Sequence, residues 1–182
     1  MDSFIVNHSY WILLLPLLSF LINGLYLGKR NWKAAAYLAT GCIGVSLLWV
    51  FGLTATYYEQ VVGNADLFMH QTAIAWEYNW MPIGSHAYLG FDLVAKIGML
   101  LDPISIMMLI VICTIAFLVN IYSIGYMKDD PSAGRFFALL SLFTFSMLGL
   151  VISTNILQMF VFWELVGLSS FLLIAILFLQ MT

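Results

Sequence analysis

Long apolar runs alternate with short polar segments along this chain, and nearly all charged residues lie in the polar segments. Charges are absent from residues 3–28, 34–58, 103–127, 136–163 and 165–182. Most of these stretches reach the roughly 20 residues that an α-helix needs to cross the hydrocarbon core of a bilayer. The pattern therefore predicts membrane-spanning helices joined by polar connections.

Five spans are predicted, at residues 10–27, 34–57, 103–126, 136–153 and 156–179. Pro103 suits the first turn of its helix, because its missing N–H would have no helical partner there. The first span is followed by Lys29 and Arg30 rather than by a small-residue cleavage site. We therefore expect it to remain as a membrane anchor. We interpret residues 1–182 as a single all-α transmembrane domain.

The segment 59–102 is too polar to span a membrane, yet it is rich in aromatic residues. Apolar side chains alternate with other residues between positions 74 and 80, which is the period of a half-buried strand. Residues 82–85 supply turn formers before a second apolar run at 88–93. We predict a β-hairpin on the outer membrane face that acts as a lid or as an interfacial anchor for aromatic rings.

The composition agrees with a membrane protein and excludes several other classes. Hydrophobic residues make up 63% of the chain, charged residues 8%, and the mean hydropathy is +1.01. A soluble domain carries about a quarter charged residues. Six Lys and Arg residues in a chain of net charge −3 give nucleic-acid binding no electrostatic basis.

The basic residues predict the orientation, because Lys and Arg near the ends of spans are retained on the cytoplasmic side. The connector 29–33 holds three of them, and the five-span arrangement places Lys128 and Arg135 on the same side. Lys96 is the one basic residue on the other side. We therefore expect the N-terminus outside and the C-terminus in the cytoplasm.

Small residues within the spans favour close approach of neighbouring helices. They are Gly41, Gly44, Ser46, Gly149, Gly167, Ser169 and Ser170. Five helices form a bundle with limited self-burial, so we expect further helices from elsewhere to cover it.

Metal and cofactor sites are not expected in this chain. Asp66, His70, Glu77 and His86 have the chemistry of metal ligands, but their spacing does not match a known site. The two cysteines lie far apart in apolar runs, and the sequence contains no nucleotide-binding fingerprint.

Glu164 is the candidate residue for chemistry, because it is the one charge inside a predicted span. A charged side chain at that depth costs about 2.5–3.5 kcal/mol on insertion scales. The protonation of a carboxyl group in apolar surroundings depends strongly on whether a cation lies nearby, which suits proton transfer. A neutral Glu164 that hydrogen-bonds across a helix interface is the alternative, but intramembrane acids more often mark ion pathways.

The neighbours of Glu164 narrow its possible partners. Gly167 and Leu168 share its helix face, and Phe160 and Phe171 are expected to shield the same side. The five predicted spans contain no Lys, Arg or His. The partner of Glu164 would therefore be a cation from another chain, a cation from another part of this chain, or water.

The fourth span carries two hydroxyl groups that are one helical turn apart. They belong to Ser141 and Thr144 and could hold waters that lead toward Glu164. Such hydroxyl groups more often bond to their own helix backbone, so we do not assign them this role.

Four segments of the chain resemble a known family. They are Leu-Asp-Pro-Ile-Ser at 101–105, Tyr-Ser-Ile-Gly-Tyr-Met at 122–127, Gly-Arg-Phe-Phe-Ala at 134–138, and Phe-Trp-Glu-Leu-Val-Gly-Leu-Ser-Ser-Phe-Leu-Leu-Ile at 162–174. In order and spacing they resemble the N-terminal part of subunit L, or chain 5, of respiratory complex I, the NADH:quinone oxidoreductase. This family belongs to the antiporter-like membrane subunits, and the resemblance covers nearly the whole chain.

The resemblance implies proton translocation driven by electron transfer elsewhere in a complex. Glu164 matches the glutamate on the fifth helix of the family, which works with a lysine on the seventh. NADH, FMN, iron–sulfur clusters and quinone would bind to partner subunits, in a bacterial plasma membrane. Family members have more helices, so we expect a companion chain to supply the rest, or this chain to be a truncated product.

Two other functions remain open from the sequence. One is a subunit of a multisubunit cation/proton antiporter without redox chemistry, which copurification with redox subunits would exclude. The other is a structural assembly fragment. In that case a change at Glu164 would alter assembly and leave pumping by each assembled complex intact.

Overall fold

A computed structural model describes residues 8–62, 73–86, 91–128, 130 and 132–180. Its elements in chain order are α2 (Trp11–Ile22), the π-helical segment η1 (Asn23–Leu27), α3 (Gly28–Arg30), α4 (Trp32–Val62), β1 (Ala73–His86), β2 (Phe91–Leu101), α5 (Pro103–Tyr126), α6 (Ala133–Val151) and α7 (Ile156–Gln180). The fold is thus mostly helical with one small two-stranded sheet.

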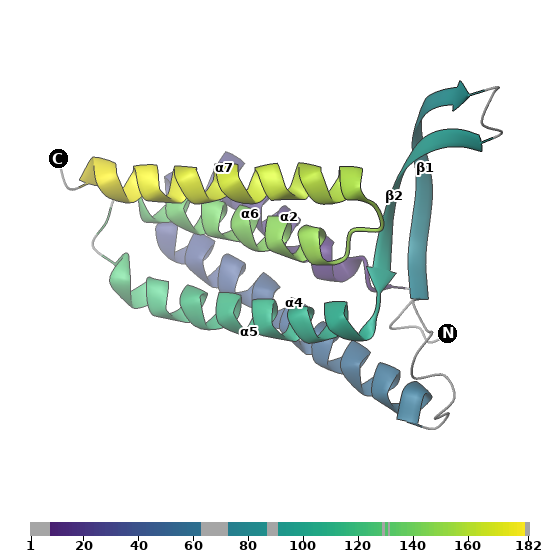
Figure 1. The fold of residues 1–182 in the computed structure, drawn as a ribbon. Helices are drawn as coiled ribbons and strands as arrows, with labels where there is room; N and C mark the ends of the chain where they lie inside the picture. Colours follow the sequence, from purple (N-terminus) through teal and green to yellow (C-terminus); the bar gives the residue numbers. More distant parts are fainter. Residues whose placement is uncertain (1–7, 63–72, 87–90, 129, 131, 181–182) are drawn as a thin grey trace.

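The long helices lie side by side and alternate in direction, and the two strands project from one end of the bundle (Figure 1). We call this end the hairpin end. The connections between α2 and α4 and between α5 and α6 lie at the opposite end, which we call the loop end. Helix α7 also ends at the loop end, as an odd number of antiparallel helices requires.

The predicted spans are confirmed as four to five membrane-capable helices. Four long helices are apolar enough to cross a bilayer, at Trp32–Glu59, Pro103–Tyr126, Ala133–Val151 and Ile156–Ile176. The first span forms a shorter apolar helix, Trp11–Leu27. Several boundaries differ from the prediction by a few residues. The largest differences are that α4 continues to Val62 and that α6 begins at Ala133, through residues that are polar or small but compatible with a helix.

The first span is irregular at its loop end. The N–H of Gly28 donates to the carbonyl oxygen of Asn23, five residues earlier, which is the hydrogen bond of a π-helix. The Asn23 side chain is fully buried beside this turn. Its Nδ2 donates to the carbonyl oxygen of Ala35 over 3.1 Å and so ties α2 to the start of α4.

The start of α5 is fixed by a reciprocal cap. Asp102 Oδ1 accepts a hydrogen bond from the backbone N–H of Ser105 over 2.7 Å, and Ser105 Oγ accepts one from the N–H of Asp102 over 2.8 Å. Pro103 occupies the first helical turn, as its sequence position predicted. Two N–H groups that a helix start leaves without helical partners are thereby satisfied.

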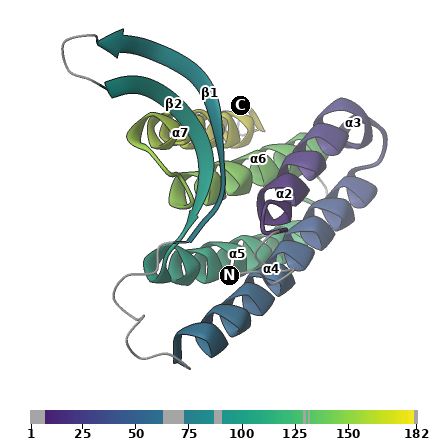
Figure 2. The ribbon, with the colours of Figure 1, turned by 90° about the vertical axis from the view of Figure 1, so that its right-hand side faces the viewer.

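Helix α6 lies at the centre of the bundle, against α2, α4, α5 and α7 (Figure 2). In its apolar stretch 61% of the residues are buried, whereas only 6% are buried in that of α7. The core has one cluster near the hairpin end, including Ile12, Val50, Leu101, Leu109 and Leu148, and one near the loop end, including Ala36, Ala39, Met127, Phe136 and Phe137.

Only some of the small residues allow close packing. Gly149 faces the ring of Phe162 so closely that a Cβ atom would overlap it. A Cβ atom on Gly44 would lie 3.1 Å from the ring of Phe117. At Gly41 and Gly167 no atom of the described residues lies within 4 Å of an added Cβ atom, so no helix of this chain packs closely there.

The predicted hairpin is present, but its turn lies elsewhere. Strands β1 and β2 pair antiparallel from Ala73 opposite Leu101 to His86 opposite Phe91. Residues 82–85, which were expected to form the turn, lie inside β1. The ladder absorbs Pro82 through a register shift between Pro82 and Gly84, which suits a residue that cannot donate a backbone hydrogen bond.

Candidate functional site

Glu164 lies in the ninth position of α7 and is exposed on the surface of the described helices. It lines a pocket of about 350 Å³ together with Ile156, Met159, Phe160 and Trp163. Most of these residues are three or four positions apart, so one face of α7 builds the pocket. Phe160 thus flanks Glu164 as predicted, whereas Phe171 is 67% exposed and does not line this pocket.

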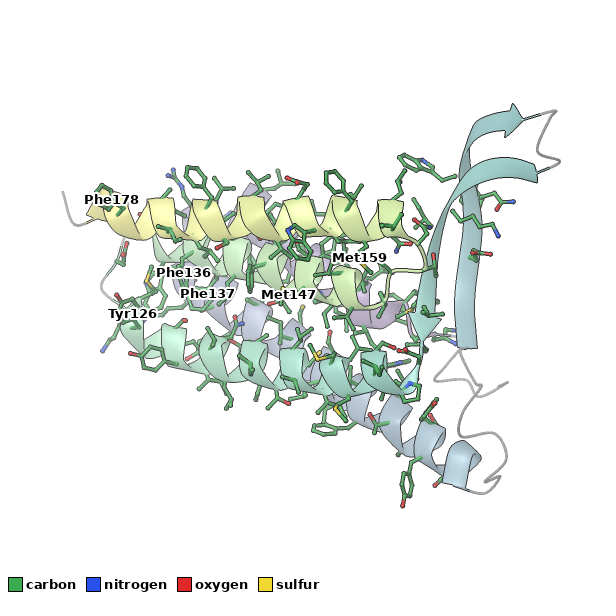
Figure 3. The ribbon with its side chains drawn as sticks, viewed as in Figure 1. Tyr126, Phe136, Phe137, Met147, Met159 and Phe178 are labelled. Carbon is green, nitrogen blue, oxygen red and sulfur yellow. The ribbon has the colours of Figure 1, made fainter. Side chains whose placement is uncertain are left out.

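Helix α7 is the least buried of the four long helices. Helix α7 runs along one side of the molecule, from Met159 near the hairpin end to Phe178 at the loop end (Figure 3). Large apolar side chains beside Glu164 remain open, with Trp163 66% and Phe160 62% exposed. An apolar surface of this kind around a single carboxyl group is typical of a helix face that packs against another helix and encloses a polar group.

Glu164 has no basic partner within salt-bridge distance among the side chains that the structure describes. The ion pair found among them joins Lys96 and Glu77 over 3.0 Å, on the hairpin. The described side chains therefore offer Glu164 no cation at this distance. This agrees with the sequence, in which the predicted spans carry no basic residue.

The hydroxyl groups of α6 do not lead toward Glu164. Ser141 Oγ donates to the carbonyl oxygen of Phe137 over 3.0 Å, and Thr144 Oγ1 donates to that of Leu140 over 2.9 Å. Ser141 Oγ also lies 3.0 Å from Ser19 Oγ of α2. Both side chains thus bond within their own helix, and Ser141 additionally joins α6 to α2.

A second residue of α7, which sequence reasoning did not single out, connects the helix to the hairpin. The Gln158 side chain is 6% exposed. Its Oε1 accepts a hydrogen bond from the backbone N–H of Gly98 over 3.0 Å, and its Nε2 donates to the carbonyl oxygen of Gly98 over 2.9 Å. The one feature of the sequence that could have revealed this role is an amide side chain in the first turn of an apolar helix.

The turn between α6 and α7 extends this attachment along β2. The N–H of Leu100 donates to the carbonyl oxygen of Ile152 over 2.9 Å, and Asn155 Nδ2 donates to the carbonyl oxygen of Lys96. Every second residue from Lys96 to Leu100 is therefore bonded on the edge of β2 opposite β1. Asn155 also accepts from the N–H of Gln158 over 2.8 Å, which caps α7.

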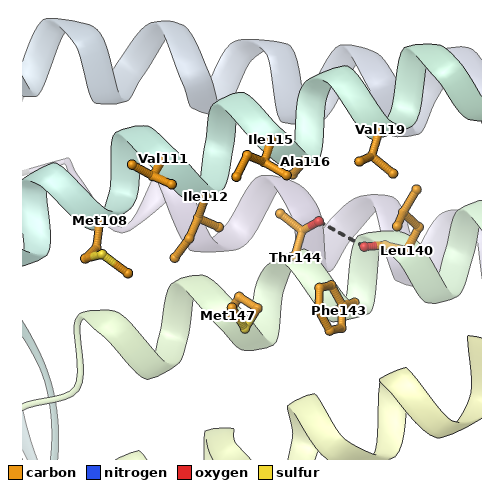
Figure 4. A pocket seen from close by; sticks show the side chains of 10 residues that line it. All are labelled: Met108, Val111, Ile112, Ile115, Ala116, Val119, Leu140, Phe143, Thr144 and Met147. Atoms are coloured by element: carbon orange, nitrogen blue, oxygen red, sulfur yellow. Dashed lines mark hydrogen bonds between the residues drawn. The ribbon is translucent and has the colours of Figure 1, made fainter.

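A further cavity of about 250 Å³ lies between α5 and α6 (Figure 4). Its lining residues are Met108, Val111, Ile112, Ile115, Ala116, Val119, Leu140, Phe143, Thr144 and Met147. The one hydroxyl group among them, on Thr144, is bonded to Leu140. This cavity is apolar and offers no group for proton transfer.

The metal-ligand candidates are only partly described by the structure. Asp66 and His70 lie outside the described residues, and the side chain of His86 is not described either. Glu77 is paired with Lys96. Among the described residues, no group of three or more His, Cys, Asp or Glu side chains is arranged to hold a metal ion.

Comparison with known proteins agrees with this architecture. The family model for the chain 5 N-terminus of NADH-ubiquinone oxidoreductase (complex I) matches residues 80–137. The match covers the second half of β1, all of β2 and α5, and the start of α6.

Similar curated proteins extend the match over most of the chain. NAD(P)H-quinone oxidoreductase subunit 5 from the chloroplast of Anthoceros angustus is 38% identical over 177 residues, which is 93% of this chain and 22% of that protein. NAD(P)H-quinone oxidoreductase chain 5 of Picosynechococcus sp. is 35% identical, over 92% of this chain and 24% of that protein. NADH-ubiquinone oxidoreductase chain 5 of Metridium senile is 38% identical, over 90% of this chain and 24% of that protein.

A solved structure shares the fold. A chain of the membrane-bound sulfane sulfur reductase, an archaeal respiratory membrane complex, matches with a TM-score of 0.66 and 17% identity. The match covers 90% of this chain and 29% of that one. This chain thus spans about a quarter of the length of the proteins that it matches. The family model and the relatives show that it is similar to the N-terminal part of chain 5 of complex I.

Proposed function

We propose that this chain is a proton-translocating membrane part of an NAD(P)H-quinone oxidoreductase, and that Glu164 takes up and releases the proton. The observation that carries the proposal is the position of Glu164. It is the one charged residue of α7 and lies in an apolar pocket on the least buried of the four long helices. The names of the relatives support the oxidoreductase assignment.

The apolar face around Glu164 suggests how the site works. Further helices would pack against Phe160 and Trp163 and would bring a basic side chain into the pocket. When this cation lies close, it favours the carboxylate, and when it moves away, Glu164 binds a proton.

The redox chemistry belongs to partner subunits in this proposal. NADH, FMN, iron–sulfur clusters and quinone would bind there, and their reactions would move the cation through conformational coupling. Other membrane and peripheral subunits of the complex are therefore the expected partners. A companion chain, or further sequence of this one, supplies the remaining helices.

The chain is an integral membrane protein, and we propose a bacterial plasma membrane for it. The proposed orientation places the hairpin end outside and the loop end in the cytoplasm, because the basic residues gather at the loop end. A chloroplast relative shows that this type of chain also occurs in organelles.

The test is Glu164→Gln in the assembled complex, reconstituted into liposomes. We expect this variant to oxidise NADH but to transport fewer protons per NADH than the wild type, because a glutamine cannot carry the proton. Glu77→Gln is the matched control, since it makes the same change on the hairpin. If Glu164→Gln pumped as many protons per NADH oxidised as the control, the role of Glu164 would be wrong.

A mild purification with mass spectrometry of the accompanying chains tests the assignment of the complex. Recovery with flavin and iron–sulfur subunits supports the oxidoreductase. Recovery with antiporter subunits alone would replace it by a cation/proton antiporter. Recovery without any partner would contradict a role in an assembled pump.

A further inference from the structure

We infer that the loop end carries a binding site for the phosphate group of an anionic phospholipid. The site is formed by the turn between α2 and α4 and by the first turn of α6. Arg30, Lys33 and Arg135 would bind the phosphate, and the apolar surface of η1 would lie along an acyl chain. This site is separate from the pocket around Glu164.

A backbone contact brings the two halves of the site together. Gly28 precedes the basic turn, Gly134 lies in the first turn of α6, and their main chains touch. A Cβ atom on Gly134 would overlap the carbonyl oxygen and the Cα atom of Gly28. Arg135 follows this contact directly, and Lys29 and Arg30 follow it on the other chain segment. Basic residues that are about 100 positions apart in sequence therefore flank one backbone contact.

Aromatic side chains hold two of these cations at the level of the helix ends. Arg30 Nη1 donates to Tyr26 Oη over 2.8 Å, and the guanidinium carbon lies 5.8 Å from the centre of the Tyr26 ring. Lys33 Nζ lies 5.9 Å from the centre of the Trp32 ring. Tyr and Trp concentrate where a membrane meets water, so these contacts place both cations at the headgroup layer. Tyr26 uses one of the five donors of Arg30, and four remain for a phosphate.

The positive charge at this place is not neutralised by nearby carboxylates. Arg30, Lys33 and Arg135 are exposed, and none has a carboxylate oxygen within 4.0 Å among the described side chains. Asp130 Oδ1, in the same connection as Arg135, accepts the N–H of Ser132 over 2.6 Å. By sequence, five basic residues at the loop end face two acidic ones, Asp129 and Asp130.

The apolar surroundings identify the occupant as a lipid rather than a soluble anion. Leu25 is 79% exposed and Tyr26 is 60% exposed, and both lie in η1 directly before the basic turn. Tyr37, on the first turns of α4, is 67% exposed. A phosphate at Arg30 that carried acyl chains could bury this surface, whereas a free phosphate could not. Basic clusters at the ends of membrane helices attract anionic lipids in the same way.

The test measures lipid retained by the full-length protein in its complex. The complex is exchanged into nanodiscs of phosphatidylcholine with a minor share of phosphatidylglycerol, and the bound lipids are counted by native mass spectrometry. The variants are Arg30→Gln, Arg135→Gln and the pair together. Arg30→Lys keeps the charge, and Lys96→Gln removes one at the hairpin end.

We expect each glutamine to lower the retained phosphatidylglycerol about fivefold, because one cation near an anionic surface contributes about that factor. Arg30→Lys and Lys96→Gln should retain the wild-type amount. Gly134→Val keeps every charge but pushes the first turn of α6 away from the turn between α2 and α4. The complexes that assemble with this variant should therefore also retain less phosphatidylglycerol. In each variant the N-terminus must remain accessible from the same side of the membrane as in the wild type. This control is needed because basic residues also set the orientation of the protein.

Three outcomes would overturn the proposal. The first is equal phosphatidylglycerol retention in wild type and in the double variant. The second is an equal loss in Lys96→Gln, which would indicate a general charge effect. The third is full displacement of the lipid by inorganic phosphate, which would indicate an anion site without a role for the acyl chain.

Discussion

Gln158 in the first turn of α7 pairs with both backbone groups of Gly98 in β2, over 3.0 Å and 2.9 Å. A side-chain amide has the same donor and acceptor as a peptide group, so Gln158 takes the place of a residue in a neighbouring strand. Glu164 follows on the same helix after six residues, less than two turns away. The hairpin thereby fixes the position of the helix that carries the candidate proton carrier.

We expect Gln158→Leu to destabilise the attachment of the hairpin to α7. Leucine has nearly the same size but leaves a buried donor and a buried acceptor of Gly98 without partners. Each such group costs about 1–3 kcal/mol. The measurement is hydrogen exchange at the backbone of β2, which should become faster around Gly98. Met159→Leu, at an exposed neighbouring position, should leave the exchange unchanged. Equal exchange in both variants would show that the pairing of Gln158 with Gly98 does not hold the hairpin to α7.

The contact between Gly28 and Gly134 predicts a strong position dependence for glycine substitution. Gly134→Ala should destabilise the protein by about 1–3 kcal/mol, the range for overpacking, because its Cβ atom would overlap the backbone of Gly28. Gly41→Ala is the matched control within a helix, where open space surrounds the position. This variant should gain about 0.5–1 kcal/mol, because alanine favours a helix over glycine. Thermal denaturation in detergent measures both, and similar melting temperatures would exclude the close contact.

Gly149 and Phe162 should show coupled effects, because the ring of Phe162 covers the Gly149 backbone. Gly149→Ala alone should lower the melting temperature, since its Cβ atom would overlap the ring. Phe162→Leu alone should cost a smaller amount through lost packing, including the edge-to-face contact with Phe145, whose ring centre lies 5.6 Å away. The double variant should be more stable than the sum of the two changes predicts, because leucine leaves room for the new methyl group. Additive effects would contradict direct contact between α6 and α7 at this point.

The positions of the membrane-capable helices followed from the sequence because their physical cause is local. A gap between charges has to match the thickness of a bilayer, and α5 begins at Pro103 and ends at Tyr126 as that rule predicted. The turn of the hairpin was misplaced because Pro82 usually ends a strand, whereas here a register shift opposite Val94 accommodates it. Local preference could not reveal a shift that depends on the partner strand.

The candidate site was predictable only as a single residue. Glu164 was evident because one charge interrupts a long apolar run. The role of Gln158 depends on Gly98, which lies 60 positions away in sequence. The same holds for the meeting of Gly28 and Gly134. Contacts between distant segments leave no periodic signal in the chain. Gly41 and Gly167 also lie in apolar helices, like the glycines that make close contacts, yet neither has a close neighbour among the described residues.

The attachment of β2 to the α6–α7 turn also has a consequence for biosynthesis. The hairpin leaves the ribosome before α5, α6 and α7, yet three of its backbone positions, at Lys96, Gly98 and Leu100, find their partners only in Ile152, Asn155 and Gln158. Because chains fold as they emerge, from the N-terminus onward, this strand edge stays open until the last of these helices has entered the membrane. The outer edge of β2 can therefore be fully hydrogen-bonded only after all five helices are in place.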